Sequence, residues 1–217
     1  MKNWMIFGDS YSTHRDHIPA GYPAYYCDEG RGEDAPVTRM LVRETWWWRL
    51  LESTGARLIQ NNSWSGSTIC YTGYHGDCSG NSSFICRYKK LLANGFFETN
   101  AIDTILVFGG TNDSWADAPL GEEQYEDFRH EDLFSVLPAI YYLMGELRRN
   151  HPTARVVFIA NCDIKREVVE GMKRAAERLG AECIELCDIE KESGHPTVRG
   201  MEQIYEQVSQ GLEDLSR

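Results

Sequence analysis

The chain has 217 residues, 42% hydrophobic and 25% charged, which suits one folded domain over residues 1–217 with a full core. Its formal net charge of −11 disfavours nucleic acid and anionic membranes as partners, because their phosphates would repel it. No apolar run approaches the roughly 20 residues of a membrane span. A signal peptide is not expected, since Gly8 and Asp9 interrupt the first apolar run. We therefore expect a cytoplasmic protein that acts on a small molecule, with a homo-oligomer as one option.

The cysteines favour thiols over disulfides. There are seven, an odd number, in a chain expected in a reducing compartment. Cys70, Cys78 and Cys86 are evenly spaced, but structural zinc sites use cysteine pairs two to four residues apart, and no matching second pair is present. We predict neither a metal site nor a cofactor.

Short apolar runs of strand length alternate with longer amphipathic stretches. Strands are expected at residues 4–7, 58–60, 104–108, 156–160 and 183–186, and helices at 45–53, 133–150, 165–179 and 198–215. Alternating strands and helices indicate right-handed βαβ units and a parallel sheet. We predict an α/β fold, a three-layer α/β/α sandwich whose parallel five-stranded sheet has the flavodoxin-like order 2-1-3-4-5.

Two connections are too long for ordinary loops, residues 11–44 and residues 62–83. Both follow early strands and overhang the carboxyl edge of the sheet, where long loops usually build a substrate pocket. Loop aromatics that could stack on a sugar ring or line an acyl pocket are Tyr22, Tyr25, Tyr26, Trp64, Tyr71, Tyr74 and Trp115. Trp46, Trp47 and Trp48 lie on a predicted helix and are expected in the core. Arg87 could be a pocket cation or a helix-surface charge, and the second interpretation is preferred.

Four polar, glycine-containing segments follow four of the strands. They are Gly8-Asp9-Ser10, residues 61–67 with Gly66, residues 109–113 with Asn112, and Gly194-His195-Pro196. In the order 2-1-3-4-5, the second and third strands flank the first, so Gly66 and Asn112 can approach Ser10 from either side. The loop before His195 is long enough to fold back over the sheet.

These residues suit a serine acyl hydrolase. The Ser10 hydroxyl is a poor nucleophile until a base removes its proton, and the His195 imidazole has a suitable pKa. The oxyanion formed by attack needs hydrogen-bond donors already in place. The backbone N–H groups of Ser10 and Gly66 and the side-chain amide of Asn112 could supply three. Asp9 is expected to cap the turn through its carboxylate.

The four segments resemble the sequence blocks of the SGNH hydrolase superfamily, also called the GDSL-type esterases and lipases. The blocks occur in the family's order and extend over nearly the whole chain, and together they are far more specific than any one of them. The resemblance implies that Ser10 is the nucleophile and His195 the base. It also implies an oxyanion hole made of Ser10, Gly66 and Asn112.

The chain departs from the family pattern at position 192. The family usually has an aspartate three residues before the histidine, where this chain has Glu192. Glu192 ranks first as the group that orients His195, because glutamate serves in some hydrolase triads and the spacing fits. Asp188 is a second candidate, and a backbone carbonyl in a Ser–His dyad is a third. The other histidines compete with His195 as the base: His14, His17, His75, His130 and His151, of which the first two lie close to Ser10 in sequence.

The expected function is a serine esterase that removes short acyl groups, acetyl above all, from a carbohydrate or small polar alcohol. The polar second loop and the lack of a long apolar lid motivate this hypothesis. A lipase or thioesterase acting on longer chains is the alternative within the same chemistry. From other classes, a flavodoxin-like FMN-binding protein and a carbohydrate-binding relative without catalysis remain open.

Overall fold

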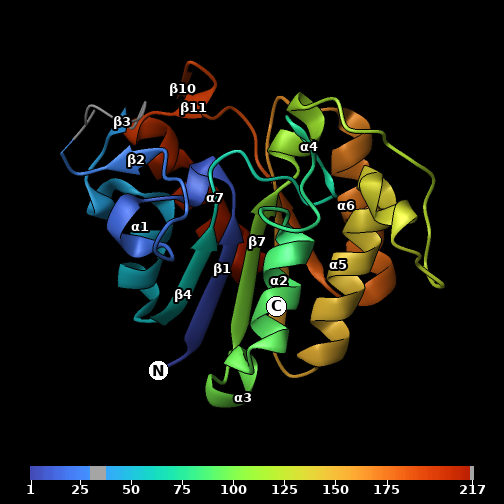
Figure 1. Cartoon of the computed structure of the whole chain (residues 1–217). Coiled ribbons are helices and arrows are strands. Elements are labelled where there is room, and N and C mark those ends of the chain that lie inside the picture. Colours follow the sequence, from blue (N-terminus) through green and yellow to red (C-terminus); the bar gives the residue numbers. More distant parts are fainter. Residues whose placement is uncertain (30–37, 216–217) are drawn as a thin grey trace.

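The computed structural model describes residues 1–29 and 38–215, and a parallel five-stranded sheet forms its centre (Figure 1). In chain order the strands are β1 (Asn3–Gly8), β4 (Arg57–Ser63), β7 (Thr104–Gly109), β8 (Arg155–Ala160) and β9 (Glu182–Glu185). They lie side by side as β4-β1-β7-β8-β9, and each neighbouring pair is parallel. The predicted order 2-1-3-4-5 is confirmed.

The three inner strands, β1, β7 and β8, are buried on both faces, so successive side chains serve two separate cores. In β1, Met5 and Phe7 join one apolar cluster, whereas Trp4 and Ile6 join the other. β7 divides its side chains in the same way. This alternation explains why the strands read as continuous apolar runs in the sequence.

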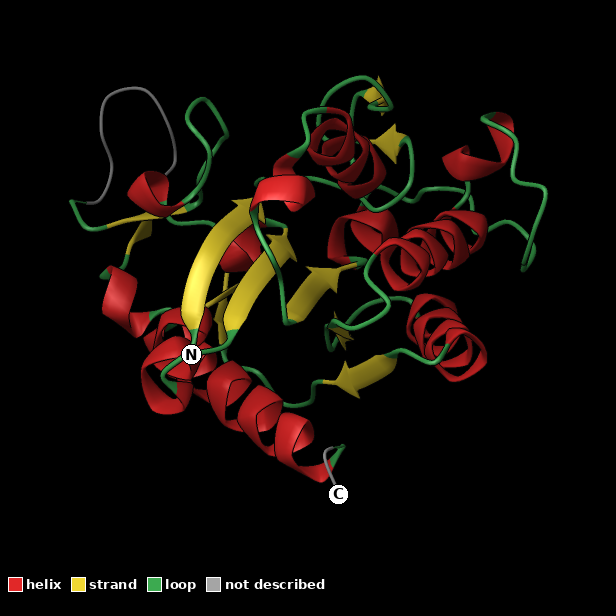
Figure 2. Cartoon of the chain, turned by 90° about the horizontal axis from the view of Figure 1, so that it is seen from below, coloured by secondary structure: helices red, strands yellow, loops and turns green. Residues whose placement is uncertain are grey.

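Helices cover both faces and complete the three layers (Figure 2). On one face lie α1 (Trp46–Thr54) and α7 (Val198–Asp214), and on the other lie α2 (Phe84–Ala93), α5 (Val136–Asn150) and α6 (Arg166–Leu179). Four of these match the predicted helices closely, and the prediction that Trp46 and Trp47 are core residues is confirmed by their complete burial. Along residues 1–29 and 38–215, no helix is both long and apolar enough to cross a lipid bilayer.

Short elements cap the edge of the sheet at which β1, β4 and β7 end (Figure 1). The first long connection contains the 3-10 helices η1 (Ser10–Ser12), η2 (Arg15–His17) and η3 (Val42–Glu44) and the paired strands β2 (Tyr26–Cys27) and β3 (Thr38–Arg39). The second contains the hairpin of β5 (Thr72–Gly73) and β6 (Gly76–Asp77).

Three helices of the described residues were not predicted from the sequence, and two others, η4 (Glu131–Phe134) and α5, were predicted as a single helix. The unpredicted helices are α2, α3 (Phe96–Thr99) and α4 (Thr111–Trp115). The predicted helix 133–150 is interrupted at Ser135, which is extended and separates η4 (Glu131–Phe134) from α5. The short antiparallel pair β10 (Lys191–Glu192) and β11 (His195–Pro196) also lies at the loop-bearing edge of the sheet.

Candidate active site

Ser10 lies in a rigid turn directly after β1. The Asp9 carboxylate accepts a hydrogen bond from the backbone N–H of Tyr11 at 3.0 Å, so the predicted cap is confirmed. The Thr13 hydroxyl donates to the Ser10 carbonyl at 3.0 Å. Only 3% of Ser10 is exposed. Burial raises the pKa of the Asp9 carboxyl to about 7, because removing a carboxylate from water disfavours its charged form.

His195 faces the Ser10 hydroxyl across a separation of 185 residues in the chain. Its Nε2 lies 2.9 Å from Ser10 Oγ, and its Nδ1 lies 3.3 Å from the carbonyl oxygen of Ser193. A carbonyl only accepts, so this contact requires the proton on Nδ1 and leaves the Nε2 lone pair facing Ser10. Burial lowers the pKa of His195, which favours the neutral, proton-accepting imidazole at neutral pH.

Tyr25 supports the ring of His195 from one side. The two rings are stacked, with centroids 3.6 Å apart and planes inclined by 6°. The backbone N–H of Tyr25 donates to the Thr13 hydroxyl at 2.9 Å, which ties the tyrosine to the turn that carries Ser10. The sequence placed Tyr25 among the pocket-side aromatics but gave no signal that it would contact the histidine.

The two histidines nearest Ser10 in sequence are occupied elsewhere. His14 is buried, with Nε2 3.1 Å from the carbonyl oxygen of Met40 and 3.3 Å from an Asp28 carboxylate oxygen. His17 packs its ring against the rings of Trp47 and Trp48. Neither histidine has a hydrogen bond to Ser10 among the described residues.

The carboxylates considered for orienting His195 do not reach it in this structure. Glu192 is paired in register with His195 across the β10–β11 hairpin, yet its side chain is exposed. Asp188 is also exposed, at a backbone φ of 51°. Within the part of the chain that the structure describes, no hydrogen bond or ion pair joins either carboxylate to the imidazole. The contact observed at Nδ1 is the Ser193 carbonyl.

Gly66 lies on the loop after β4, and Asn112 lies at the start of α4 after β7, so the two residues flank the Ser10 turn. Gly66 has a φ of 81°, which strains any residue with a side chain, and a Cβ there would meet nothing within 4 Å. Asn112 is buried, and its amide donates to the Ser67 carbonyl at 3.0 Å while its oxygen accepts from the Tyr74 hydroxyl at 3.0 Å. This pairing fixes the orientation of the amide and leaves one N–H without a partner among the described residues.

Comparison with known proteins agrees with this geometry. The family model for GDSL-like lipases/acylhydrolases matches residues 2–212. The chain belongs to this family. The GDSL-like lipases/acylhydrolases form part of the SGNH hydrolase superfamily, and the chain is accordingly a serine ester hydrolase.

Two solved structures resemble this GDSL-like hydrolase over nearly their whole length. A protein from Bacteroides uniformis described as GDSL-like lipase is 41% identical, with a TM-score of 0.86, and the match covers 99% of this chain and 96% of that one. Another from Bacteroides ovatus is 37% identical, with a TM-score of 0.87, and the match covers 99% of each chain. A comparison with curated protein sequences found no match.

More distant structures share the fold. A family two carbohydrate esterase from Clostridium thermocellum is 14% identical with a TM-score of 0.66, and the match covers 98% of this chain and 63% of that chain. The aryl esterase of M. smegmatis is 13% identical with a TM-score of 0.62, and the match covers 99% of this chain and 100% of that chain. At these identities the similarity establishes the architecture alone.

A buried cation underlies the GDSL-type site, and the preferred interpretation of Arg87 as a helix-surface charge is wrong. Arg87 is fully buried on α2. Its guanidinium donates to the Gly8 carbonyl at 3.2 Å, to the Ser67 hydroxyl at 3.1 Å and to the Asn62 side chain at 2.7 Å. Burial lowers the pKa of Arg87 to about 10, which still leaves it charged at neutral pH. Arg87 therefore joins the end of β1 to the loop that carries Gly66.

Asp113 joins α4, which carries Asn112, to the loop that carries Gly66. Its buried carboxylate accepts from the backbone N–H of Ile69 at 2.9 Å and of Cys70 at 3.0 Å. Burial raises the pKa of this carboxyl. The loops on both sides of Ser10 are thus held together by buried polar contacts, which suits a site whose donors must be in place before reaction.

Proposed function

We propose that this chain hydrolyses short-chain acyl esters, acetyl esters above all, of a carbohydrate or small polar alcohol. The reaction proceeds through an acyl-enzyme on Ser10. The observation that carries the proposal is the 2.9 Å contact between His195 Nε2 and Ser10 Oγ, with Nδ1 facing a carbonyl. This arrangement suits proton transfer from the hydroxyl to the imidazole as the serine attacks.

The proposed mechanism has two displacements. His195 takes the Ser10 proton while Oγ attacks the ester carbonyl, and the resulting imidazolium gives that proton to the departing alcohol. Water, deprotonated by the same histidine, then releases the acyl group from Ser10. We assign the orientation of His195 to the Ser193 carbonyl, so the unit is a Ser–His dyad. Stacking on Tyr25 gives the ring a second support.

The tetrahedral intermediates of both displacements carry an oxyanion. We assign its binding to the backbone N–H groups of Ser10 and Gly66 and to the remaining amide N–H of Asn112. Tyr74 supports this assignment, because its hydroxyl donates a hydrogen bond to Asn112 Oδ1 and so fixes which end of the amide is the nitrogen. One N–H of that nitrogen donates to the Ser67 carbonyl, and the other is available for the oxyanion.

Replacing Asn112 with alanine is expected to lower kcat by about 10²- to 10³-fold and to change KM much less, because the lost donor binds charge that develops in the transition state. Asn100→Ala is the matched control, since its amide also donates to a backbone carbonyl, that of Phe96 at 2.9 Å, but at the end of α3. Steady-state kinetics on a nitrophenyl ester measure both. A kcat for Asn112→Ala within about twofold of the wild type would remove Asn112 from the oxyanion hole.

Replacing Glu192 with alanine distinguishes a triad from a dyad. We expect kcat to stay within about twofold of the wild type, because the Glu192 side chain is exposed to solvent, which screens its charge. Asp188→Ala, tested in parallel, should behave alike. A loss approaching the ~10⁴-fold typical of a missing triad acid would instead make that carboxylate the group that orients His195.

A cavity beside Gly66 supports the polar character of the substrate. It has a volume of about 220 Å³ and lies between the Gly66 loop and the β5–β6 hairpin. Its lining combines aromatic rings, hydroxyls, an amide and a carboxylate, from Trp64, Thr68, Tyr74, Asp77, Asn81 and Ser82. Such groups suit hydrogen bonding to an alcohol rich in hydroxyls better than binding of a long alkyl chain.

A series of nitrophenyl esters of increasing acyl length, together with acetylated sugars, tests the proposed substrate class. We expect the highest kcat/KM for acetyl, with a steady fall as the chain lengthens, and no turnover by Ser10→Ala. An optimum at eight or more carbons would identify a lipase or thioesterase. Absence of turnover on every ester, together with binding of sugars, would identify a carbohydrate-binding relative.

A further inference from the structure

The histidine is carried by a very tight hairpin. Lys191 and Glu192 pair with Pro196 and His195, and the turn between them is Ser193-Gly194. Both turn residues have positive φ, 49° and 79°, which is typical of the type I′ turn that connects such strands. The carbonyl that contacts His195 Nδ1 belongs to this turn. The position of the turn therefore determines how the imidazole is oriented.

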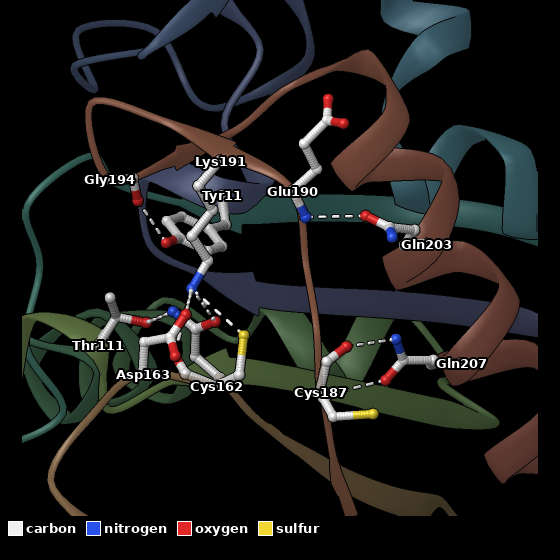
Figure 3. Close-up of polar contacts among 11 residues, drawn as sticks. Tyr11, Thr111, Cys162, Asp163, Cys187, Glu190, Lys191, Gly194, Gln203 and Gln207 are labelled. Carbon is white, nitrogen blue, oxygen red and sulfur yellow. Dashed lines mark hydrogen bonds and ion pairs between the residues drawn. The ribbon is translucent and has the colours of Figure 1, made fainter.

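Lys191 fixes one strand of this hairpin to the end of β8 (Figure 3). Its ammonium lies 3.3 Å from Asn161 Oδ1, 3.2 Å from the Cys162 carbonyl oxygen and 3.1 Å from Asp163 Oδ2. Only 12% of the lysine side chain is exposed. Because burying an ammonium is costly unless it is paired, this is a specific docking site rather than a solvated charge.

The hairpin and its docking site also contact the segments that carry Asn112 and Ser10. Asn161 is fully buried, and its amide donates to the Thr111 hydroxyl at 3.2 Å, next to Asn112. Tyr11, next to Ser10, donates from its hydroxyl to the Gly194 carbonyl at 2.5 Å (Figure 3). The Lys191 ammonium also lies 5.7 Å from the centre of the Tyr11 ring.

The segment before the hairpin is held separately. Gln207 on α7 exchanges two hydrogen bonds with the backbone of Cys187, at 2.9 and 2.7 Å, and Gln203 accepts from the N–H of Glu190 at 2.8 Å (Figure 3). These contacts attach residues 187–190 to the helix without touching the turn. Gln207 is therefore a suitable control for a general loosening of this loop.

We propose that Lys191 is a positioning residue for catalysis. Its docked ammonium holds the Ser193-Gly194 turn so that the Ser193 carbonyl orients His195, the role that a carboxylate has in a triad. The inference rests on the proposed roles of Ser10 and His195, and it adds a basic residue that the sequence analysis did not single out. A displacement of about 1 Å at reacting groups can cost ~10²-fold in rate, so loss of this anchor should be measurable.

The lysine charge also acts on the histidine directly. The groups that face His195 are Ser10 and Tyr11 on η1, Tyr25, Trp115 on α4 and Lys191. Of these, Lys191 carries the charge at neutral pH, and it adds to the effect of burial in lowering the pKa of His195. Removing the charge should raise that pKa, whereas loss of the hydrogen bond to the Ser193 carbonyl, which raises the pKa of His195, should lower it. Because the Ser193 hydrogen bond has the larger effect of the two, a loosened turn should move the acidic limb of the pH–rate profile to lower pH.

The test compares Lys191→Met, Lys191→Arg and Gln207→Ala with the wild type, using nitrophenyl acetate from about pH 5 to about pH 9. We expect Lys191→Met to lower kcat by about 10- to 10²-fold with little change in KM, and to shift the acidic limb to lower pH because His195 loses the Ser193 hydrogen bond. Lys191→Arg should restore most of kcat and the wild-type limb, because it keeps the charge. Gln207→Ala should resemble the wild type in both respects.

Wild-type kcat in Lys191→Met, with the acidic limb unmoved or moved to higher pH, would overturn the inference. An equal loss of kcat in Gln207→Ala would overturn it too. If Lys191→Met does not fold, Asp163→Asn removes one partner of the ammonium at a side chain that is 77% exposed. It should then lower kcat several-fold, and an unchanged kcat would overturn the inference. Ser10→Ala separates this from failure of the proposed function, because turnover that survives Ser10→Ala removes the dyad itself, whatever Lys191 does.

Discussion

Ser10→Ala is expected to lower kcat on a small ester by about 10⁴-fold or more, leaving only the rate that binding and the oxyanion donors supply. His195→Ala should cause a loss of similar size, because the hydroxyl is a weak nucleophile without its base. The double variant should be no worse than either single one, since the two residues act as a unit. Steady-state kinetics with nitrophenyl acetate measure all three.

Ser12→Ala is the control for these variants. Ser12 is buried in the same 3-10 turn, two residues from Ser10, and its hydroxyl has no hydrogen-bond partner among the described residues. It should keep near wild-type kcat. A rate for Ser10→Ala within about tenfold of the wild type would contradict the proposed mechanism, because a covalent step through that serine could not then be the main route.

Arg87→Met is expected to lower the free energy of unfolding by about 3–5 kcal/mol, the largest stability effect of any substitution considered. The guanidinium is fully buried and serves acceptors on three segments, at Gly8, Asn62 and Ser67. Methionine fills part of the space but leaves these acceptors without a donor. Arg87→Lys should also be destabilising, because an ammonium cannot reproduce the planar fork of donors.

Lys90→Met is the matched control on the same helix, since Lys90 is exposed and its ammonium contacts the Gly80 carbonyl at 2.9 Å. Urea unfolding should show a change of about 1 kcal/mol or less for this variant. A similarly small change for Arg87→Met would mean that water or rearranged side chains satisfy the acceptors. In that case Arg87 would not be the group that holds the loops under the site.

The sheet could be predicted because its inner strands β1, β7 and β8 are buried on both faces and its strands alternate with amphipathic helices. The sequence pattern therefore gave the strand order and placed the carboxyl ends of β1, β4 and β7 at one edge. Helix α2 escaped prediction because it carries Arg87, Lys89 and Lys90 within one turn and a half. A cation on the buried face of a helix breaks the apolar period on which such predictions depend.

The approach of His195 to Ser10 was expected from the family blocks, and the structure brings the two side chains within hydrogen-bond distance. The group that orients His195 could not be predicted. Whether Glu192 or the Ser193 carbonyl meets Nδ1 depends on the two positive φ angles of the turn, which spacing does not encode. The contacts of Tyr25 and Lys191 join segments far apart in the chain, and no local pattern predicts them.

The most direct test of the central claim, that His195 activates Ser10 as a nucleophile, is covalent labelling with a fluorophosphonate followed by peptide mass spectrometry. We expect rapid formation of a single adduct, located on Ser10. Labelling should be as rapid in Glu192→Ala and very slow in His195→Ala. No adduct on the wild-type protein, or an adduct on another serine, would contradict the account.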